Sequence, residues 1–387
     1  MQKNSFETQI EASKKYIPGI EKALLATYFT NYDQKLLLTD EGKTDIENNV
    51  FRRYNHSLRH VVPWISRHIN LEGKKVLEIG CGTGSSTAAL AHYVQQIEGY
   101  DIHSLAIVGA QKRLDIMGLN NVRLHLIDEE SLITRISEDA ENRYDIILLF
   151  AVLEHQTITE RHDTITKCWE LLANNGIMAV IDTPNILHYF DIHTSKLPFL
   201  HMLPSRLYAR YAVNSPRFAF SNSFSDEKQK SNSLLDMKIA RWGRGVSYHD
   251  FELSLGKDYQ KFTVAEGFEP EIIDWFACTP EEEILRWYVQ YKHFDVPLGF
   301  TRCVLNIIFK KFPDNDALAQ YSAKRLPPPP FKHFAPNLSE LNKRLQIMEK
   351  DLQDKNNLIE QIYCSKTWRT GNKIADTYRR ILQLFNK

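Results

Sequence analysis

Lys75-Val-Leu-Glu-Ile-Gly-Cys-Gly-Thr-Gly-Ser85 is the stretch of sequence that decides the fold. Its first five residues form a short apolar run typical of a buried β-strand, and residues 85–95 favour a helix. Glycines at every second position separate the two. Glycine adopts left-handed backbone conformations and has no Cβ, so such a turn brings free backbone N–H groups close to a ligand. The stretch therefore predicts a ligand-binding loop between a strand and a helix.

Further apolar runs predict that this strand belongs to a doubly wound parallel sheet. Residues 98–101, 122–127, 144–150 and 177–181 have the pattern of strands, and residues 105–117 and 158–173 have that of helices. Strands that alternate with helices form a parallel sheet, because each helix carries the chain back along it. We therefore expect five parallel strands with helices on both faces.

The strand pattern breaks after Asp182. Residues 183–261 are rich in aromatic residues, histidine, serine and proline and show weak periodicity. A connection of this length is usually functional or disordered. Two strand-like runs, 269–276 and 301–311, then return. We predict that these runs complete a seven-stranded sheet, and that 183–261 is an irregular cap inserted after the fifth strand.

The regions outside this sheet form four segments. The spacing of apolar residues in 1–70 predicts helices, and this region precedes the α/β domain, which spans 71–312 and includes the cap. Residues 313–336 include a run of prolines at 327–330 and predict a semi-rigid linker. A coiled coil is expected at 337–363 and a basic amphipathic tail at 364–387.

The coiled coil is predicted from apolar residues at alternating spacings of three and four, interrupted by Lys355. They are Leu338, Leu341, Leu345, Met348, Leu352, Ile359 and Ile362. This is the spacing of a helix seam that packs against another helix, and Asn337 with Glu340 gives a capping pair at its start. We expect the chain to form a homo-oligomer through this segment.

The composition is that of a globular protein and narrows the possible functions. Hydrophobic residues make up 43% of the chain and charged residues 25%, and 48 basic residues balance 48 acidic ones. A general nucleic-acid binder would carry a basic excess, so we expect no nucleic-acid partner. The five cysteines are scattered without a C-x-x-C pair, which predicts neither a disulfide framework nor a zinc site.

The sequence favours a cytoplasmic protein. The first residues lack the apolar run of a signal peptide, and no stretch approaches the ~18 apolar residues that a membrane span requires. The tail carries six Lys and Arg residues, and its apolar residues fall on one helical face. Such a tail can lie on the anionic inner face of a membrane, contact a partner enzyme such as a glycosyltransferase, or pack as a further helix of the oligomer.

The spacing of the glycines separates two classes of cofactor loop. Dinucleotide dehydrogenases use G-x-G-x-x-G, whereas Ser85 stands here where that pattern needs its third glycine. The spacing E-x-G-x-G-x-G instead resembles motif I of the class I S-adenosylmethionine-dependent methyltransferases, in particular the bacterial Methyltransferase-23 and -11 groups. The resemblance covers about residues 50–311. It implies a seven-stranded Rossmann-like sheet and S-adenosylmethionine as the cofactor.

Acidic residues at the ends of three predicted strands agree with this resemblance. It implies that Glu78 orders the loop and the methionine end of the cofactor, and that Asp128 faces the adenine amino group. A carboxylate at Asp101 can accept hydrogen bonds from both ribose hydroxyls. Ile102 and Leu126 or Ile127 would flank the adenine ring. The implied cofactor-binding set is Glu78, Gly80, Cys81, Gly82, Gly84, Asp101, Ile102, Asp128 and Phe150, and Arg53, Tyr54 and Arg59 are candidates to bind the cofactor carboxylate.

The segment after the fourth strand points to the class of acceptor. Residues 150–155 contain Leu-Glu-His and resemble a run common in small-molecule and sugar methyltransferases, without the N-P-P-Y or D-P-P-Y signature of nucleic-acid and protein amine methylation. A hydroxyl acceptor needs a base, for which His155, Asp182 and His193 are the candidate catalytic residues. Asp191 and His193 with Asp250 or Glu252 match no metal motif, so no metal site is predicted.

The tail suggests a biological context. Ser-x-x-Trp-Arg at 365–369 resembles the S-x-S-W-R-x-T-x-P-L-R tail of bacterial surface-polysaccharide enzymes, although residues 371–374 depart from the rest of that motif. We therefore expect methylation of a sugar hydroxyl or a related small group in cell-surface polysaccharide biosynthesis. The alternatives are a methyltransferase of a small metabolite or lipid headgroup, a non-catalytic scaffold of a glycan assembly complex, and a dehydrogenase.

Overall fold

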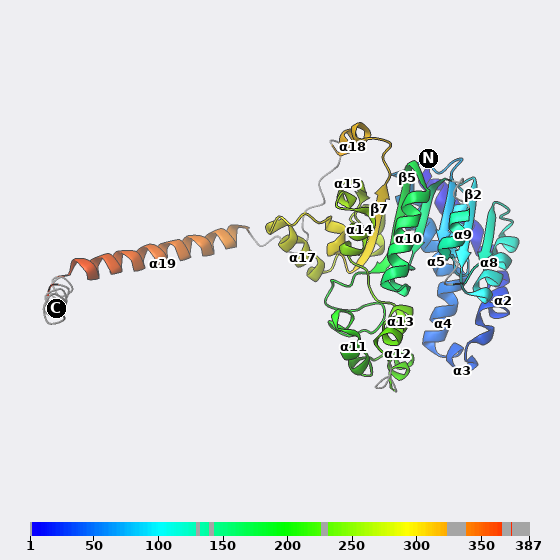
Figure 1. Cartoon of the computed structure of the whole chain (residues 1–387), viewed down its shortest axis with the longest axis horizontal. Coiled ribbons are helices and arrows are strands. Elements are labelled where there is room, and N and C mark those ends of the chain that lie inside the picture. Colours follow the sequence, from blue (N-terminus) through cyan, green and yellow to red (C-terminus); the bar gives the residue numbers. More distant parts are fainter. Residues whose placement is uncertain are drawn as a thin grey trace. The chain divides into compact units, whose positions relative to one another are not determined.

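A computed structural model of the chain describes residues 2–128, 132–138, 143–225, 231–322, 338–365 and 373. The chain divides into two compact units, 1–329 and 330–387. In the first unit, helices surround a central sheet (Figure 1). The described part of the second unit contains the long helix α19 (Leu338–Cys364).

The described residues form a sheet of seven strands in the order β3-β2-β1-β4-β5-β7-β6. The strands are β1 (Lys75–Ile79), β2 (Gln96–Asp101), β3 (Val122–Leu126), β4 (Tyr144–Phe150), β5 (Leu172–Pro184), β6 (Thr263–Ala265) and β7 (Val304–Lys310). Strands β1 to β5 pair in parallel, and β7 runs antiparallel to both β5 and β6. The prediction of a seven-stranded, doubly wound α/β sheet is confirmed.

One predicted strand is wrong. The run 269–276 does not enter the sheet, because Pro270–Trp275 forms helix α16, with Pro270 in its first turn. Proline has no N–H to donate to a strand ladder, and at the start of a helix none is needed. The sixth strand is instead β6, which is only three residues long. The predicted last strand is present as β7.

Helices precede the sheet and alternate with its first five strands. The N-terminal helices are α1 (Gln2–Ser13), α2 (Ile17–Leu25), α3 (Gln34–Leu37), α4 (Asp40–Glu47), α5 (Arg53–His56) and α6 (Val62–Ser66). Those between the strands are α7 (Ser85–Ala91), α8 (Ser104–Met117), α9 (Leu132–Glu138) and α10 (Ile158–Leu171). Helix α10 begins with a complete capping box from Thr157 and Glu160.

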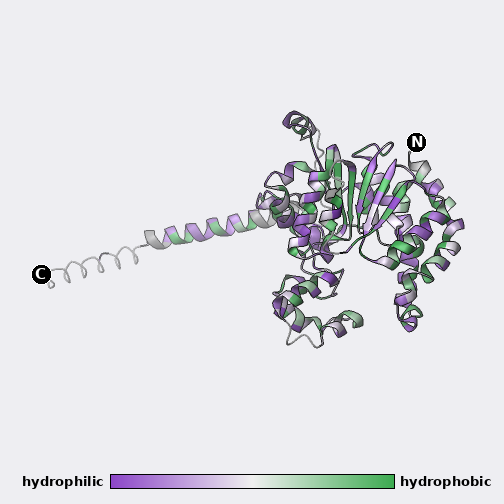
Figure 2. Cartoon of the chain, turned by 45° about the vertical axis from the view of Figure 1, so that its right-hand side comes forward, coloured by the Kyte–Doolittle hydropathy of each residue, from purple (hydrophilic) through white to green (hydrophobic). Residues whose placement is uncertain are grey.

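Both faces of the sheet are buried by alternate residues of its strands. Val76 and Ile146 pack in one core with the N-terminal helices, α7 and α8. Leu77 and Ile147 belong to a second core on the other face, which includes residues of α10 and of the segment after the cap. In Figure 2 green, hydrophobic residues occur in the strands of the sheet beside purple, hydrophilic ones. Side chains alternate between the faces of a strand, so a strand covered on both sides reads as a continuous apolar run.

The cap is helical, and the expectation of an irregular insertion is wrong. Its helices are α11 (Ser205–Ala212), α12 (Phe218–Ser223), α13 (Asn232–Trp242), α14 (Tyr248–Leu255) and α15 (Tyr259–Phe262). The first three bury their own small core, in which Tyr208, Phe220 and Ile239 are fully buried. Helix α14 packs on α10. Helices of one to three turns show little period, because each presents too few residues to define a face.

The segments after the sheet are described in part. Helix α17 (Pro280–Tyr291) lies between the cap and β7 in the sequence. Helix α18 (Asn315–Ser322) follows β7 and lies inside the predicted linker. Residues 323–336 and Asn337 lie outside the described residues, as does the tail except for 364, 365 and 373. Helix α19 spans most of the predicted coiled coil, and its side chains Met348 and Leu352 are 71% and 62% exposed.

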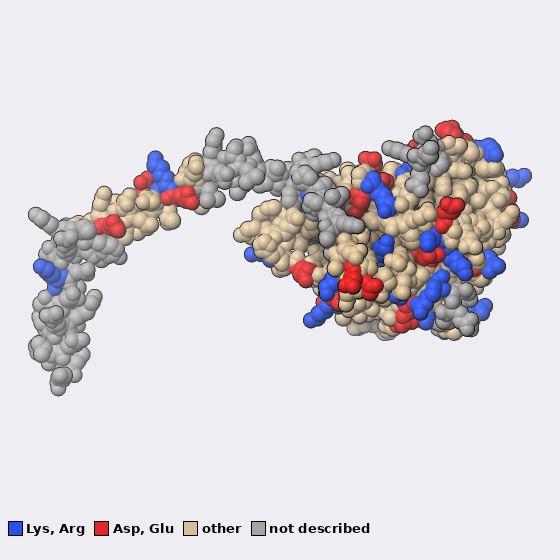
Figure 3. All heavy atoms as spheres, turned by 90° about the horizontal axis from the view of Figure 1, so that it is seen from above, with Lys and Arg blue, Asp and Glu red and all other residues tan. Residues whose placement is uncertain are grey.

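Two surface properties of the described residues bear on the partners of the chain. None of the described helices combines the length and the apolar character needed to cross a membrane. On the face shown in Figure 3, basic and acidic side chains are interspersed.

Candidate functional site

The glycine loop lies between β1 and α7, at the carboxyl edge of the parallel strands. Gly80, Gly82 and Gly84 have φ angles of +74°, +51° and +72°, which disfavour other residues. A Cβ at Gly80 would collide with the side chain of Val152, and one at Gly84 would lie 3.0 Å from Ala110 Cβ. A Cβ at Gly82 would meet nothing within 4 Å. Gly82 therefore faces open space, where a ligand can approach the backbone.

Asp101, the last residue of β2, holds this loop in place. Its Oδ2 accepts a hydrogen bond from Gly82 N at 2.7 Å, and its Oδ1 accepts one from His103 N at 2.8 Å. From the sequence we expected Asp101 to bind the ribose hydroxyls, and these backbone contacts were not foreseen. Each carboxylate oxygen has a second lone pair, so both roles are compatible.

Glu78 lies under the loop and is fully buried. Its Oε1 accepts a hydrogen bond from Ser86 Oγ at 2.5 Å, while its Oε2 has no hydrogen-bond partner among the described residues. Burial raises the pKa of Glu78, and the charge of Asp101 adds to this effect. A buried carboxylate oxygen without a donor is unfavourable unless a ligand supplies one. The site thus suits a ligand with a positively charged or donor group.

A shallow cavity of about 520 Å³, wide open to solvent, lies beside the ends of β2 and β3. Its lining consists of Ile102, Ser104, Leu126, Ile127 and Asp128. The structure therefore brings together the residues that the sequence analysis placed around an adenine ring. Apolar side chains together with a carboxylate are suited to a flat ring that carries an amino group.

Two other residues of the predicted cofactor set, Cys81 and Phe150, do not line this cavity. Cys81 is buried, with its side chain against Gly99 of β2, so it fills space beneath the loop. Phe150 ends β4 and packs against Trp275 with ring centroids 6.4 Å apart. No contact among the described residues ties either side chain to the cavity beside Asp128.

The three candidates to bind a cofactor carboxylate occupy different positions. Tyr54 is buried, and its hydroxyl lies 2.9 Å from His92 Nε2. Arg59 is exposed. Arg53 is also exposed, and its charge lowers the pKa of Asp182 at the end of β5, which places it near the carboxyl edge of the sheet. Arg53 is thus the candidate nearest the site.

Sequence reasoning missed a buried arginine that fastens the N-terminal region to the glycine loop. Arg113 of α8 donates through Nε to Thr83 O at 2.8 Å and through a guanidinium nitrogen to Val50 O at 3.0 Å. Asn49 joins the same network, because its Oδ1 accepts a hydrogen bond from Thr83 Oγ1 at 3.2 Å. These residues are far apart in the sequence, and no motif marks them.

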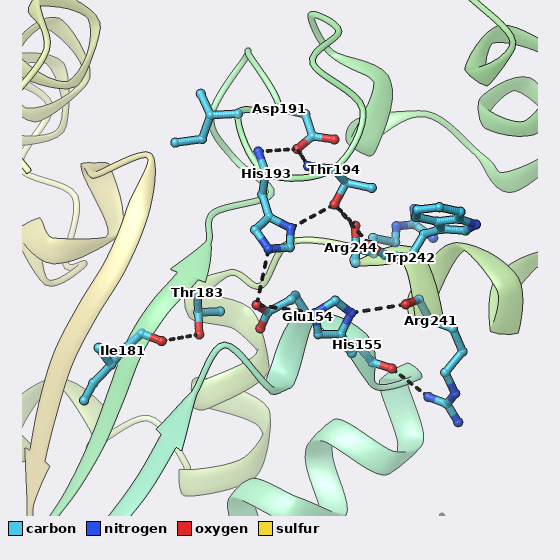
Figure 4. Close-up of polar contacts among 12 residues, drawn as sticks. Glu154, His155, Ile181, Thr183, Asp191, His193, Thr194, Arg241, Trp242 and Arg244 are labelled. Carbon is cyan, nitrogen blue, oxygen red and sulfur yellow. Dashed lines mark hydrogen bonds and ion pairs between the residues drawn. The ribbon is translucent and has the colours of Figure 1, made fainter. Parts of the chain in front are cut away.

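Two of the three predicted catalytic residues lie together beside a buried carboxylate (Figure 4). His155 belongs to the 3-10 turn η5 (Leu153–His155) after β4, and His193 comes from the cap. Their Nε2 atoms lie 3.9 and 4.0 Å from Glu154 Oε1. Glu154 is the glutamate of the Leu-Glu-His run and was not among the predicted site residues. We call Glu154, His155 and His193 the Glu154 cluster.

Burial dominates the electrostatics of the Glu154 cluster. Glu154 is fully buried, which raises its pKa to about 8, and neither carboxylate oxygen has a hydrogen-bond partner among the described residues. Burial and the neighbouring His155 lower the pKa of His193 to about 4, and burial also lowers the pKa of His155. Both imidazoles are therefore neutral near pH 7.

Asp182, the third predicted catalytic residue, lies at the end of β5. Its φ angle is +53°, a strained conformation for a residue with a Cβ, and its backbone N–H donates to Asn306 Oδ1 at 3.1 Å. Burial raises the pKa of its carboxyl to about 7, although the charge of Arg53 opposes this rise. Its charge in turn raises the pKa of Glu154, so the two carboxyls are neighbours.

The other acidic residues that the sequence analysis weighed for a metal are engaged elsewhere. The carboxylate of Asp191 accepts hydrogen bonds from the backbone N–H groups of His193, Thr194 and Ser195 and so shapes the cap loop. Asp250 forms a buried ion pair with Arg161 at 3.1 Å. The structure does not gather Asp191, His193 and Asp250 into one site.

Comparison with known proteins agrees with this geometry. The family model described as a methyltransferase domain matches residues 70–230. The ubiquinone biosynthesis O-methyltransferase of Pseudomonas fluorescens (strain Pf0-1) is 30% identical over 115 residues, which cover 30% of this chain and 47% of that protein. The enzyme of the same name from Glaesserella parasuis serovar 5 is 32% identical over 110 residues, which cover 28% of this chain and 45% of that protein. The chain thus spans about half the length of the curated relatives it matches.

Solved structures give partial overlaps. CalS10, an amino pentose methyltransferase from Micromonospora echinaspora, is 20% identical, covers 37% of this chain and 56% of that chain, and has a TM-score of 0.29. The N-terminal domain of EvdMO1, solved with S-adenosylhomocysteine and D-fucose, is 19% identical, covers 33% and 49%, and has a TM-score of 0.27. Overlaps of this extent do not bear on the function of this chain. Residues 70–230 therefore resemble a methyltransferase domain, and the seven-stranded sheet has the Rossmann-like fold of the class I methyltransferases.

Proposed function

We propose that the whole chain is an S-adenosylmethionine-dependent methyltransferase that acts on a hydroxyl of a small molecule or glycan. The observation that carries this proposal is the glycine loop with its carboxylates. The loop exposes backbone at Gly82, Glu78 below it has a buried oxygen with no described hydrogen-bond partner, and Asp128 lines the shallow cavity at the ends of β2 and β3. All of these features lie at the carboxyl ends of parallel strands, where ligands bind in open α/β sheets.

The residues present suit this cofactor part by part. Glu78 would receive its amino group, Asp101 its ribose hydroxyls, and Ile102, Ile127 and Asp128 its adenine ring. When bound, the cofactor supplies a methyl group on a positively charged sulfur, which is open to attack by a nucleophile. The main task of the protein is then to align that group with the acceptor and to exclude water.

Asp182 is the residue that we propose to accept the proton of the acceptor hydroxyl. An alcohol is a poor nucleophile, and a base with a pKa near the working pH assists it best. Burial raises the pKa of Asp182 to about 7, which meets this requirement. Its strained backbone fixes the carboxyl at the end of β5. His155 and His193, the other two candidates, would then bind or orient the acceptor.

The class of acceptor is argued from the relatives and the cap. The matching relatives are named O-methyltransferases, which favours an oxygen acceptor. The cap adds histidines and aromatic side chains beside the catalytic edge, among them His193, and such side chains suit the hydroxyls and faces of a sugar. We propose a sugar hydroxyl or a related small group in cell-surface polysaccharide biosynthesis. A small metabolite or a lipid headgroup is the second candidate, favoured by the same relatives.

Helix α19 supports a further part of the proposal, a homo-oligomer formed through the coiled coil. Its side chains Met348, Leu352 and Ile359 are 71%, 62% and 48% exposed, at the spacing of a coiled-coil seam. We propose that the enzyme acts in the cytoplasm, with the tail on the inner membrane surface or against a glycosyltransferase.

Transfer of a labelled methyl group tests the proposed function. The full chain would be incubated with labelled S-adenosylmethionine and either a panel of nucleotide-activated sugars or a panel of catechols. Label on a sugar supports the polysaccharide assignment, whereas label on a catechol alone would replace it with the small-metabolite reading. The Asp182→Asn variant controls for background. Binding of the cofactor without transfer to any acceptor, in either panel, would contradict the proposed acceptor classes.

A further inference from the structure

We propose that the Glu154 cluster binds a divalent first-row transition-metal ion, of which zinc is the probe of choice. One ligand atom from each of Glu154, His155 and His193 lies within 4.8 Å of the other two. Two imidazole nitrogens and a carboxylate oxygen form a donor set that suits zinc, iron or cobalt better than magnesium. The proposal differs from the sequence analysis, which predicted no metal.

The hydrogen bonds of the two histidines show which nitrogen faces the cluster. His155 Nδ1 lies 3.2 Å from the carbonyl oxygen of Arg241, which can only accept, so Nδ1 carries the proton. His193 Nδ1 lies 3.0 Å from Thr194 Oγ1. The Thr194 hydroxyl already donates to Gly243 O at 2.7 Å, so it accepts from His193. Each neutral imidazole therefore presents the lone pair of Nε2 to Glu154.

Three groups that receive no hydrogen bond from a described residue at their facing atoms thus converge on one point. Glu154 is fully buried, and neither of its oxygens receives a hydrogen bond from a described residue. The imidazole rings of His155 and His193 lie beside the same carboxylate, as Figure 4 shows, with both Nε2 atoms near Glu154 Oε1. Buried acceptors without a partner are unfavourable, and a cation among the groups would supply one, with the proton of Glu154 released on binding. A metal ion satisfies all three lone-pair donors at once.

The distances allow a metal without rearrangement of the backbone. Bonds from zinc to nitrogen and oxygen are about 2.0–2.2 Å long, so two bonds placed end to end reach roughly 4.2 Å. The separations of 3.9 and 4.0 Å between Glu154 Oε1 and the two Nε2 atoms fall within this reach. Small rotations of the side chains would complete the geometry.

The surroundings hold the ligands as a metal site requires. Metal-binding histidines usually donate their other ring nitrogen to a carbonyl or hydroxyl oxygen, which fixes the ring. His155 and His193 both do so. Arg241 also donates to His155 O at 2.7 Å and pairs with Glu160, which secures the turn, and Asp191 secures the cap loop that carries His193.

Three protein ligands leave further coordination positions for water or an acceptor hydroxyl. A metal there would lower the pKa of a bound hydroxyl, and its proton would pass to Asp182. This use of the metal rests on the proposed function, whereas the binding of the metal does not.

The test is a zinc titration of the full chain after dialysis against a chelator, without S-adenosylmethionine. We expect one tight zinc per chain and much weaker binding of magnesium. His193→Ala and Glu154→Gln should each weaken zinc binding by more than about tenfold. Loss of a residue that only hydrogen-bonds to a metal ligand already lowers metal affinity by about 10–100-fold. His249→Ala is the matched control, because His249 lies in the same cap and contacts Ser247 instead. This control should bind zinc like the unaltered chain.

Circular dichroism and S-adenosylmethionine binding would show that each variant is folded. His193 is 35% exposed and comes from a loop, so its variant decides the question if Glu154→Gln fails to fold. Zinc binding that is equal in the unaltered chain and in a folded His193→Ala variant would overturn the proposal, as would a chain that binds no zinc. Zinc binding in a chain that does not bind S-adenosylmethionine would retain the metal site and reject the proposed function.

Discussion

The carboxylate of Asp101 accepts a hydrogen bond from the backbone N–H of Gly82 at 2.7 Å. This contact joins the end of β2 to the loop that follows β1, and so brings together two features that the sequence presents separately. The residue expected to bind the ribose also shapes the backbone beside it. The loop and its carboxylate therefore act as one preformed unit, which makes the consequences of substitution in the loop specific.

Alanine substitutions at Gly80 and Gly82 should differ in their effect on stability. Both residues have positive φ angles, so alanine at either position costs about 1–2 kcal/mol. Only at Gly80 does the new Cβ also collide with Val152, which adds about 1–3 kcal/mol. Urea denaturation without ligand should therefore show Gly80→Ala as the less stable variant. Equal loss of stability in the two variants would contradict the described loop.

Glu78→Gln should make the stability of the ligand-free chain depend less on pH. Burial raises the pKa of Glu78 in the folded chain above its ordinary value. The folded chain then holds a proton that the unfolded chain has lost, so the stability due to this group falls as the pH rises above the ordinary carboxyl range. Denaturation at pH 5 and pH 8 should show that the free energy of unfolding of the variant, relative to that of the unaltered chain, is higher at pH 8 than at pH 5. The exposed Glu72, replaced in the same way, should show no such gain.

The rate of methyl transfer should fall as the pH falls below about 7, the value to which burial raises the pKa of Asp182. The base must be ionised, so protonation removes about one factor of ten in rate for each pH unit below its pKa. The charge of Arg53 opposes the rise in this pKa, and Glu154 is the neighbouring carboxyl. Asp182→Asn should lower the rate by about 10²–10⁴-fold and abolish the acid limb. An acid limb that persists in this variant would assign the base elsewhere.

Leu352→Glu in helix α19 should shift the chain from oligomer to monomer. Leu352 is 62% exposed and lies on the predicted seam, where a buried charge would be strongly unfavourable. Gln353→Glu introduces the same charge one residue away, off the seam, and should leave the oligomer intact. Light scattering after size-exclusion chromatography measures the mass of each variant. A monomeric unaltered chain would show that α19 serves another purpose.

The sheet was predictable because its first five strands are buried on both faces. Runs such as 144–150 are apolar throughout, and the glycine loop marks the junction of β1 with α7. The later elements were not predictable in the same way. Strand β6 has three residues, which are too few to show the alternation of a strand. Residues 270–275 include enough apolar residues to resemble a short strand, although they form helix α16. Pro270 was the signal that favoured a helix.

The candidate site was predictable in its cofactor half. Glu78, Asp101 and Asp128 follow one another at strand ends, and parallel strands bring such positions to one edge. The Glu154 cluster was harder to foresee, because His193 comes from the cap and lies 39 positions after Glu154 in the sequence. Only the folded cap loop, held by Asp191, places His193 against Glu154. The role of Glu154 depends on its burial, which the Leu-Glu-His run does not reveal.

Calorimetric titration with S-adenosylmethionine and, separately, with NAD tests the central claim most directly. We predict micromolar binding of S-adenosylmethionine, no binding of NAD, and a loss of about 10–100-fold in affinity for Asp101→Asn, the range expected when a charged hydrogen-bond acceptor is removed. Asp115→Asn on the exposed side of α8 is the matched control and should bind like the unaltered chain. Binding of NAD in preference to S-adenosylmethionine, or undiminished binding in a folded Asp101→Asn variant, would contradict the account.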